Sequence, residues 1–157
     1  MLLIQRERKF VYRITIKTMT AQRTDTIIIN DDEHIMYGLP LEQYWQQNNN
    51  KPSLFSLNTS LNRSYYAKWL IEENKLYLID FYGECILPPP RKEYSLLDLF
   101  PSTPEKLFAE WFTGDITIPM GKQVAYFHGG WGATYEYNTT IKVCNGLVID
   151  PGSFITE

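Results

Sequence analysis

Apolar and polar residues alternate along many short segments of this chain, and an alternation with a period of two is typical of half-buried β-strands. The segments with this pattern, or with runs of branched and aromatic residues, are 10–17, 26–29, 34–37, 65–71, 76–82, 115–118, 121–127, 139–143 and 147–149. Turn-forming residues separate neighbouring segments, and Asn145-Gly146 is the strongest short-range hairpin signal among them. Residues 46–52 have no apolar period and predict an exposed loop. The pattern therefore predicts a mostly antiparallel β-protein.

Helix signals are confined to one part of the sequence, between the three prolines at 88–90 and Gly114. Prolines break a sheet because they have no N–H to donate to the ladder. Ser95 precedes an apolar stretch, and Thr103 with Pro104 resembles an N-cap followed by a first helical residue. We therefore expect an α+β fold, mostly antiparallel β. It would be a single twisted sheet or a small sandwich or partly open barrel, with one or two short helices.

The length and composition of the chain indicate one globular domain, residues 1–157. A chain of 157 residues has about the length of one domain, and it contains no repeat of fixed period and no long linker. Aromatic residues make up 15% of the chain, more than an average core would use. Some of these rings are therefore expected at the surface, where an amphipathic ring suits recognition.

Charge and cysteine content exclude several classes of protein. A net charge of -3 argues against nucleic-acid binding, which needs clustered Lys and Arg. Cys85 and Cys144 have neither metal-ligand spacing nor the density of a disulfide scaffold, so we expect reduced thiols in a cytoplasmic protein. The apolar residues 1–4 run directly into the charged segment 5–9, which predicts no signal peptide and no membrane span. With two histidines and no close ligand pair, the sequence predicts no metal and no cofactor.

The segment 128–136, His-Gly-Gly-Trp-Gly-Ala-Thr-Tyr-Glu, has the densest concentration of candidate functional residues. Its glycines suggest an anion-binding nest of backbone N–H groups. The dinucleotide and Walker patterns both fail, because no helix is predicted after the glycines and no Gly-Lys-Ser/Thr ends the loop. A bent strand corner that presents Trp131 and Tyr135 explains the glycines better.

Three further side chains have a chemical interpretation and a structural one. His128 and Glu136 are eight residues apart, which would place them on one face of a regular strand and allow general acid–base chemistry. No nucleophile adjoins them, and a histidine in this setting is more often a structural hydrogen-bonding group. Arg63, two residues before Tyr65, would hold an anionic group with its planar fork, or else stack on a neighbouring ring at the surface.

Several motifs together resemble a family of small uncharacterised bacterial proteins. They are Thr20-Ala21-Gln22, the Trp69 strand with Leu76-Tyr77-Leu78, Leu99-Phe100-Pro101, Trp111 to Pro119, and Gly121 to Glu136. The resemblance covers residues 19 to 148 and implies a pattern without an established activity. Where the family has Thr-Ala-Cys-Trp-Arg-Gly-Tyr, residues 59–65 keep only the threonine, arginine and tyrosine. The family starts near Met19, which implies that residues 1–18 are an N-terminal extension, expected to add a strand.

These observations lead to three functional hypotheses. The first is a non-enzymatic cytoplasmic bacterial protein that binds a protein partner through an aromatic, glycine-bent surface, as an immunity protein or another small inhibitor does. The second is a domain that binds a nucleotide or other small anionic ligand. The third is a hydrolase or transferase using His128 and Glu136. The residues expected to contact the partner or ligand are Arg63, Tyr65, His128, Gly130, Trp131, Tyr135 and Glu136.

Overall fold

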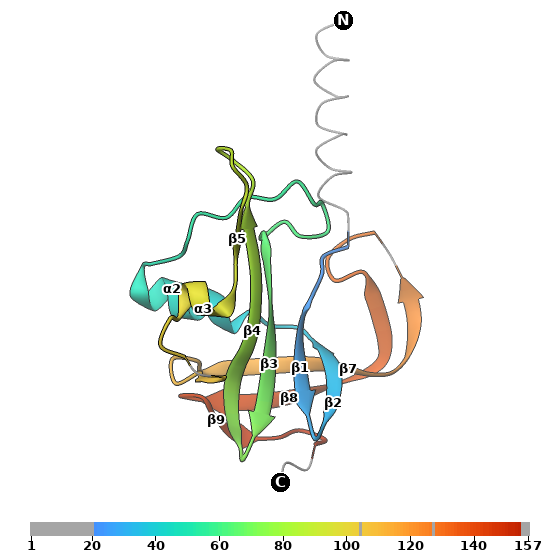
Figure 1. The fold of residues 1–157 in the computed structure, drawn as a ribbon. Coiled ribbons are helices and arrows are strands. Elements are labelled where there is room, and N and C mark those ends of the chain that lie inside the picture. The colour runs from blue at the N-terminus through green and yellow to red at the C-terminus, as the bar shows by residue number, and fades with distance from the viewer. Residues whose placement is uncertain (1–20, 104, 127, 155–157) are drawn as a thin grey trace, which may run out of the picture.

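In the computed structural model, the described residues 21–103, 105–126 and 128–154 contain a nine-stranded sheet and two short helices (Figure 1). The strands are β1 (Asp25–Ile29), β2 (Asp32–Met36), β3 (Tyr65–Glu72), β4 (Lys75–Cys85), β5 (Lys92–Tyr94), β6 (Leu107–Phe108), β7 (Gly114–Tyr126), β8 (Ala133–Cys144) and β9 (Leu147–Asp150). The helices are α2 (Pro40–Asn48) and α3 (Leu96–Leu99). The strand expected at residues 10–17, and with it the extension 1–18, lies outside the described residues.

The sheet nearly closes on itself. Its strand order is β2-β1-β3-β4-β9-β8-β7, with β5 and β6 both paired to β4. At the seam, Tyr37 follows β2 and exchanges backbone hydrogen bonds with Thr117 of β7, at N···O distances of 2.7 and 3.2 Å. All pairs are antiparallel except β1 with β3, which are connected through α2. The expected α+β fold, in its partly open barrel form, is confirmed.

Two-residue turns connect three of the hairpins. Their central residues are Asn30-Asp31, Glu73-Asn74 and Asn145-Gly146, all with positive φ. Left-handed backbone at both central positions matches the twist of the flanking strands. These three connections join the segments that the alternation pattern predicted as neighbouring strands.

Helix α2 lies on the inner face of the sheet and was not predicted. Residues 46–48 belong to it, so the exposed loop expected from residue 46 is wrong for its first three positions. Pro40 takes the first helical position, and Leu41 and Trp45 are the side chains after it that are buried. One apolar pair four residues apart gives too weak a period to detect. The Trp45 ring packs edge-on against Tyr65 at 5.1 Å between centroids.

Of the two helix starts predicted after the prolines, one is confirmed and the other is wrong. Helix α3 begins as expected, with Ser95 and Asp98 exchanging the hydrogen bonds of a capping box. The helix expected from Thr103 does not form, because Leu107 and Phe108 form β6 and pair with β4. The Ala109 N–H also donates to Leu76 O at 2.9 Å, so pairing with a distant strand overrides the local helix signal.

Strand β7 merges the two strands expected at 115–118 and 121–127. Pro119 is tolerated within it because β7 is the last strand of the sheet order. Up to Met120 the inward side chains are buried, whereas residues 121–126 are all exposed. The far part of β7 therefore extends beyond the barrel, and Figure 1 shows it curving away with β8.

Candidate functional site

The glycine-rich segment is the connection of the β7–β8 hairpin. Gly130 and Gly132 have φ values of 49° and 84°, a left-handed conformation that residues with a Cβ adopt at a cost. The Gly132 N–H donates to Gly129 O at 2.9 Å and closes the turn. Strand β8 follows directly, so the segment lacks the helix that would complete a phosphate-binding loop.

This loop is fastened to the barrel. The half-buried Trp131 ring stacks on Tyr37, with centroids 5.5 Å apart and planes inclined by 19°. The Tyr37 hydroxyl donates to Ala133 O at 3.4 Å. Burial, with a contribution from Tyr135, raises the pKa of Tyr37 above its usual value, so the hydroxyl keeps the proton that it donates. Trp131 thus contacts its own chain over part of its surface.

His128 and Glu136 have different neighbours. The His128 ring packs edge-on against Tyr126 at 5.4 Å. The Glu136 side chain lies over Gly121, where an added Cβ would meet its Oε2 at 2.7 Å. In the part of the chain that the structure describes, no hydrogen bond or ion pair joins His128 to Glu136. The acid–base hypothesis stays a prediction, without a contact between its two residues.

Arg63 is engaged by a buried carboxylate. Its Nη2 lies 2.6 Å from Asp25 Oδ1, and its Nη1 donates to Arg23 O at 2.6 Å. Asp25 is fully buried and also accepts from Ala67 N and Trp69 Nε1, both at 3.0 Å. Burial raises the pKa of the Asp25 carboxyl, and the charge of Arg63 offsets part of the rise. Both terminal nitrogens of Arg63 therefore already donate to the protein itself.

Tyr65 belongs to the core. Its side chain is fully buried, and its hydroxyl donates to Glu42 Oε1 at 2.8 Å. The Arg63 guanidinium lies over its ring at 4.9 Å from the centroid. Burial is the main reason that the pKa of Tyr65 is raised far above its usual value. The Tyr65 hydroxyl and both terminal nitrogens of Arg63 are thus used within the protein, while the Nε of Arg63 is buried without a hydrogen-bond partner among the described residues.

Gln22 links the Arg63 region to the glycine loop, which the sequence gave no reason to expect. Its backbone N–H donates to Gly130 O at 2.7 Å, while its side chain donates to Thr59 O and accepts from Asn62 N. The two groups of candidate residues are thus joined through the segment before β1. The partners of Gln22 lie about 40 and 108 residues away in sequence, so no local pattern predicts this link.

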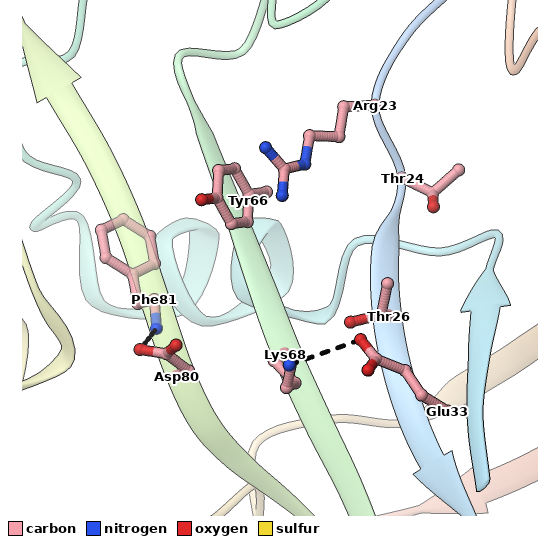
Figure 2. Close-up of a pocket in the computed structure, with 8 residues that line it drawn as sticks. All are labelled: Arg23, Thr24, Thr26, Glu33, Tyr66, Lys68, Asp80 and Phe81. Carbon is pink, nitrogen blue, oxygen red and sulfur yellow. Dashed lines mark hydrogen bonds and ion pairs between the residues drawn. The ribbon is translucent and has the colours of Figure 1, made fainter.

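A groove of about 220 Å³ lies on the outer face of the sheet, over β1, β3 and β4 (Figure 2). Its lining residues are Arg23, Thr24, Thr26, Glu33, Tyr66, Lys68, Asp80 and Phe81. None was singled out from the sequence, because they come from separate segments that only the sheet brings together. A hydrogen bond from Thr26 is the main cause that holds the pKa of Glu33 below its usual value, and Lys68 at 3.4 Å adds to it.

The outer part of the β7–β8 hairpin carries exposed apolar side chains. Val124, Tyr126 and Tyr137 are 60%, 56% and 54% exposed. We call this part, residues 121–126 and 133–138, the hairpin arm. Exposed apolar side chains that no core uses mark interaction surfaces when they cluster. Trp131 and Tyr135, the rings expected at the surface from the sequence, are half-buried. Alternation alone does not tell where a strand leaves the barrel.

Comparisons of the chain with protein-family models, with curated proteins and with solved structures found no match. The resemblance to a bacterial family therefore stays a prediction. Within residues 21–103, 105–126 and 128–154, no three His, Cys, Asp or Glu side chains gather in a way that would hold a metal ion. No helix in these same ranges has both the length and the apolar character needed to cross a membrane.

Proposed function

We propose that this chain is a non-enzymatic bacterial protein of the cytoplasm that binds a protein partner through the hairpin arm, in the manner of an immunity protein or small inhibitor. The observation that carries the proposal is the group of large apolar side chains, Val124, Tyr126 and Tyr137, each more than half exposed on one hairpin. Tyrosine is enriched where interfaces are buried most completely.

The contacts that hold the hairpin arm in place support this role. Its two strands pair with each other from Met120–Tyr137 to Tyr126–Ala133, and the loop beyond them is fastened to Tyr37 by the Trp131 stack. A surface that is ordered before binding loses less conformational entropy on association. The arm therefore presents its exposed rings at a low entropic cost.

The test is affinity capture from the native cytoplasm, followed by direct measurement of binding to the captured protein. We compare the native chain with Tyr126→Ser/Tyr137→Ser and with a control, Ile149→Ser. Ile149 is 66% exposed on β9, outside the arm. Removing interface tyrosines typically costs about 2 kcal/mol for each hot-spot residue, so the double variant should weaken binding at least about 30-fold.

Two outcomes decide the proposal. Recovery of one partner by the native chain and the Ile149 control, with loss by the tyrosine variant, supports it. Equal affinity of the partner for the native chain and the tyrosine variant removes the arm as the binding surface, and so does failure of the native chain to retain any protein. Melting curves of all three proteins show whether each variant is folded.

A further inference from the structure

The outer-face groove contains two charges that have no ionic partner of opposite sign within the described part of the chain. Lys68 and Glu33 neutralise each other across a Nζ···Oε1 distance of 3.4 Å. Among the described residues, Arg23 forms no ion pair with a carboxylate, and Asp80 forms none with a cation. Once the internal pair is set aside, one cation and one carboxylate remain on the same groove.

Arg23 is held in place for binding. Its backbone N–H donates to Ser60 O at 2.8 Å, and its carbonyl accepts from Arg63. Its guanidinium lies over the Tyr66 ring with Cζ 3.5 Å from the centroid, and Tyr66 in turn packs against Tyr82 at 5.3 Å. Stacking occupies the face of the guanidinium and leaves its N–H groups, which lie in the plane, available for a carboxylate.

Asp80 provides the opposite charge on the neighbouring strand. It pairs in register with Lys68, two residues along β3 from Tyr66. One strand spacing and two residues of rise put the Asp80 position about 8 Å from that of Tyr66. Asp80 accepts the Phe81 N–H at 2.9 Å, which fixes the carboxylate, while Lys68 is directed to Glu33 (Figure 2).

The size of the groove limits the ligand. Its volume of about 220 Å³ lies below the range of about 300–1,000 Å³ that is usual for drug-sized ligands. A nucleotide, with its several negative charges, would also meet Glu33 and Asp80. Both observations favour a small molecule that carries one charge of each sign.

We propose that this groove binds a small zwitterion of amino-acid type, with its carboxylate on Arg23 and its ammonium group on Asp80. The aliphatic part of the ligand lies over β3 between these two charges, beside Tyr66. Thr24 borders the groove near Arg23 (Figure 2) and offers its hydroxyl group to the carboxylate end, whereas the Thr26 hydroxyl donates to Glu33. This site is separate from the hairpin arm and does not depend on the proposed protein partner.

The experiment is an NMR titration of the full-length chain with three probes of equal chain length. They are γ-aminobutyrate, which carries both charges, butyrate, which is only an anion, and butylamine, which is only a cation. Because a hydrogen bond to a charged group is worth about 1.5–3 kcal/mol, γ-aminobutyrate should bind at least about tenfold more tightly than either single-charge probe. Its chemical-shift changes should centre on Tyr66, Lys68 and Asp80.

Variants assign each end of the ligand. Arg23→Gln and Asp80→Asn should each weaken γ-aminobutyrate binding about tenfold, and Asn at position 80 can still accept the Phe81 N–H. Lys92→Gln, an exposed charge change on β5, is the matched control and should leave the affinity unchanged. Melting temperatures near that of the native chain show that the variants are folded.

The other results overturn the proposal. Equal binding of butyrate and γ-aminobutyrate would indicate a simple anion site. Shifts that centre elsewhere, or no saturation by any probe, would mean that the groove does not hold such a ligand. If both Arg23→Gln and Asp80→Asn bound γ-aminobutyrate with the native affinity, the ligand would bind outside this groove.

Discussion

Two charged residues in the interior tie the start of β1 to β3. The Asp25 carboxylate receives hydrogen bonds from Arg63, from the backbone of Ala67 and from the indole of Trp69. The Arg63 side chain is only 12% exposed. A pair of charges in such a setting gains little net free energy from being ionic, but loss of one member leaves the other charge buried without compensation.

Arg63→Met should therefore destabilise the protein by about 3–5 kcal/mol at pH 7. Without the arginine the pKa of Asp25, already raised by burial, rises further. A carboxyl group whose pKa is raised on folding costs no stability below its unfolded pKa of about 3.9, and the cost grows as the pH rises from that value to the folded pKa. The deficit of the variant should thus be smaller at pH 4 than at pH 7 in urea unfolding.

The control for this prediction is Lys106→Gln, which breaks an exposed ion pair with Glu72. Exposed pairs contribute about 0–1 kcal/mol, so this variant should lose little at either pH. A loss below 1 kcal/mol in Arg63→Met, or a deficit that grows toward acid, would contradict the account of the Asp25–Arg63 pair.

At the scale of elements, the two glycine turns beside β8 differ in what surrounds them. Gly146, in the β8–β9 turn, has a φ of 79°, and an added Cβ would lie 2.7 Å from both Ala109 O and the Phe108 ring. Gly130, in the β7–β8 loop, has a φ of 49° with no atom within 4 Å of such a Cβ. Both glycines have a left-handed backbone conformation, but only Gly146 is closely packed against other residues.

Alanine at these two positions separates backbone strain from crowding. Gly130→Ala should cost about 1–2 kcal/mol, the penalty for a left-handed residue with a Cβ. Gly146→Ala should cost about 1–3 kcal/mol more, because the backbone of Ala109 and the Phe108 ring must move. Chemical denaturation of both variants gives the comparison. Equal losses would show that the β8–β9 turn yields more easily than its close contacts indicate.

What the sequence predicts correctly is local. Strand alternation and turn chemistry act over a few residues, so the hairpins around Asn74 and Asn145 and the helix start at Ser95 follow from neighbouring side chains alone. Helix α2 was missed because Leu41 and Trp45 are its only buried side chains beyond Pro40. The β6 strand was missed because its partner in β4 lies about 30 residues away in sequence.

The candidate sites depend even more on distant contacts. Trp131 stands out in the sequence among its glycine neighbours, but its stack on Tyr37 joins segments that no sequence pattern relates. The outer-face groove requires the parallel pairing of β1 with β3, which places Arg23 near Tyr66. A prediction from single residues cannot give that register, since a crossover connection leaves it free.

At the scale of the whole molecule, the barrel and the hairpin arm are separable. The buried residues that β7 and β8 contribute to the hydrophobic core are Ile116, Ile118, Ile141 and Val143. All lie between the Met120–Tyr137 pair and the open end of the hairpin at Gly114–Val143, away from the glycine-rich loop. The seam bond between Tyr37 and Thr117 also lies on this side. The barrel is thus complete without the outer part of the hairpin.

Replacing residues 121–136 with Asn-Gly, between the paired Met120 and Tyr137, should therefore leave a folded barrel, because Asn-Gly forms a two-residue hairpin turn. The lost Trp131–Tyr37 stack is worth about 0.5–1.5 kcal/mol, and the two hydrogen bonds lost with it, Gln22 N–H to Gly130 O and Tyr37 hydroxyl to Ala133 O, are worth about 0.5–1.5 kcal/mol each. The melting temperature should therefore fall by about 3–18 °C. Binding to the captured partner should be lost with Val124 and Tyr126, while γ-aminobutyrate binding should be retained. A shortened chain that does not fold would show that the arm belongs to the barrel, and one that still binds the partner at native affinity would place the interface elsewhere.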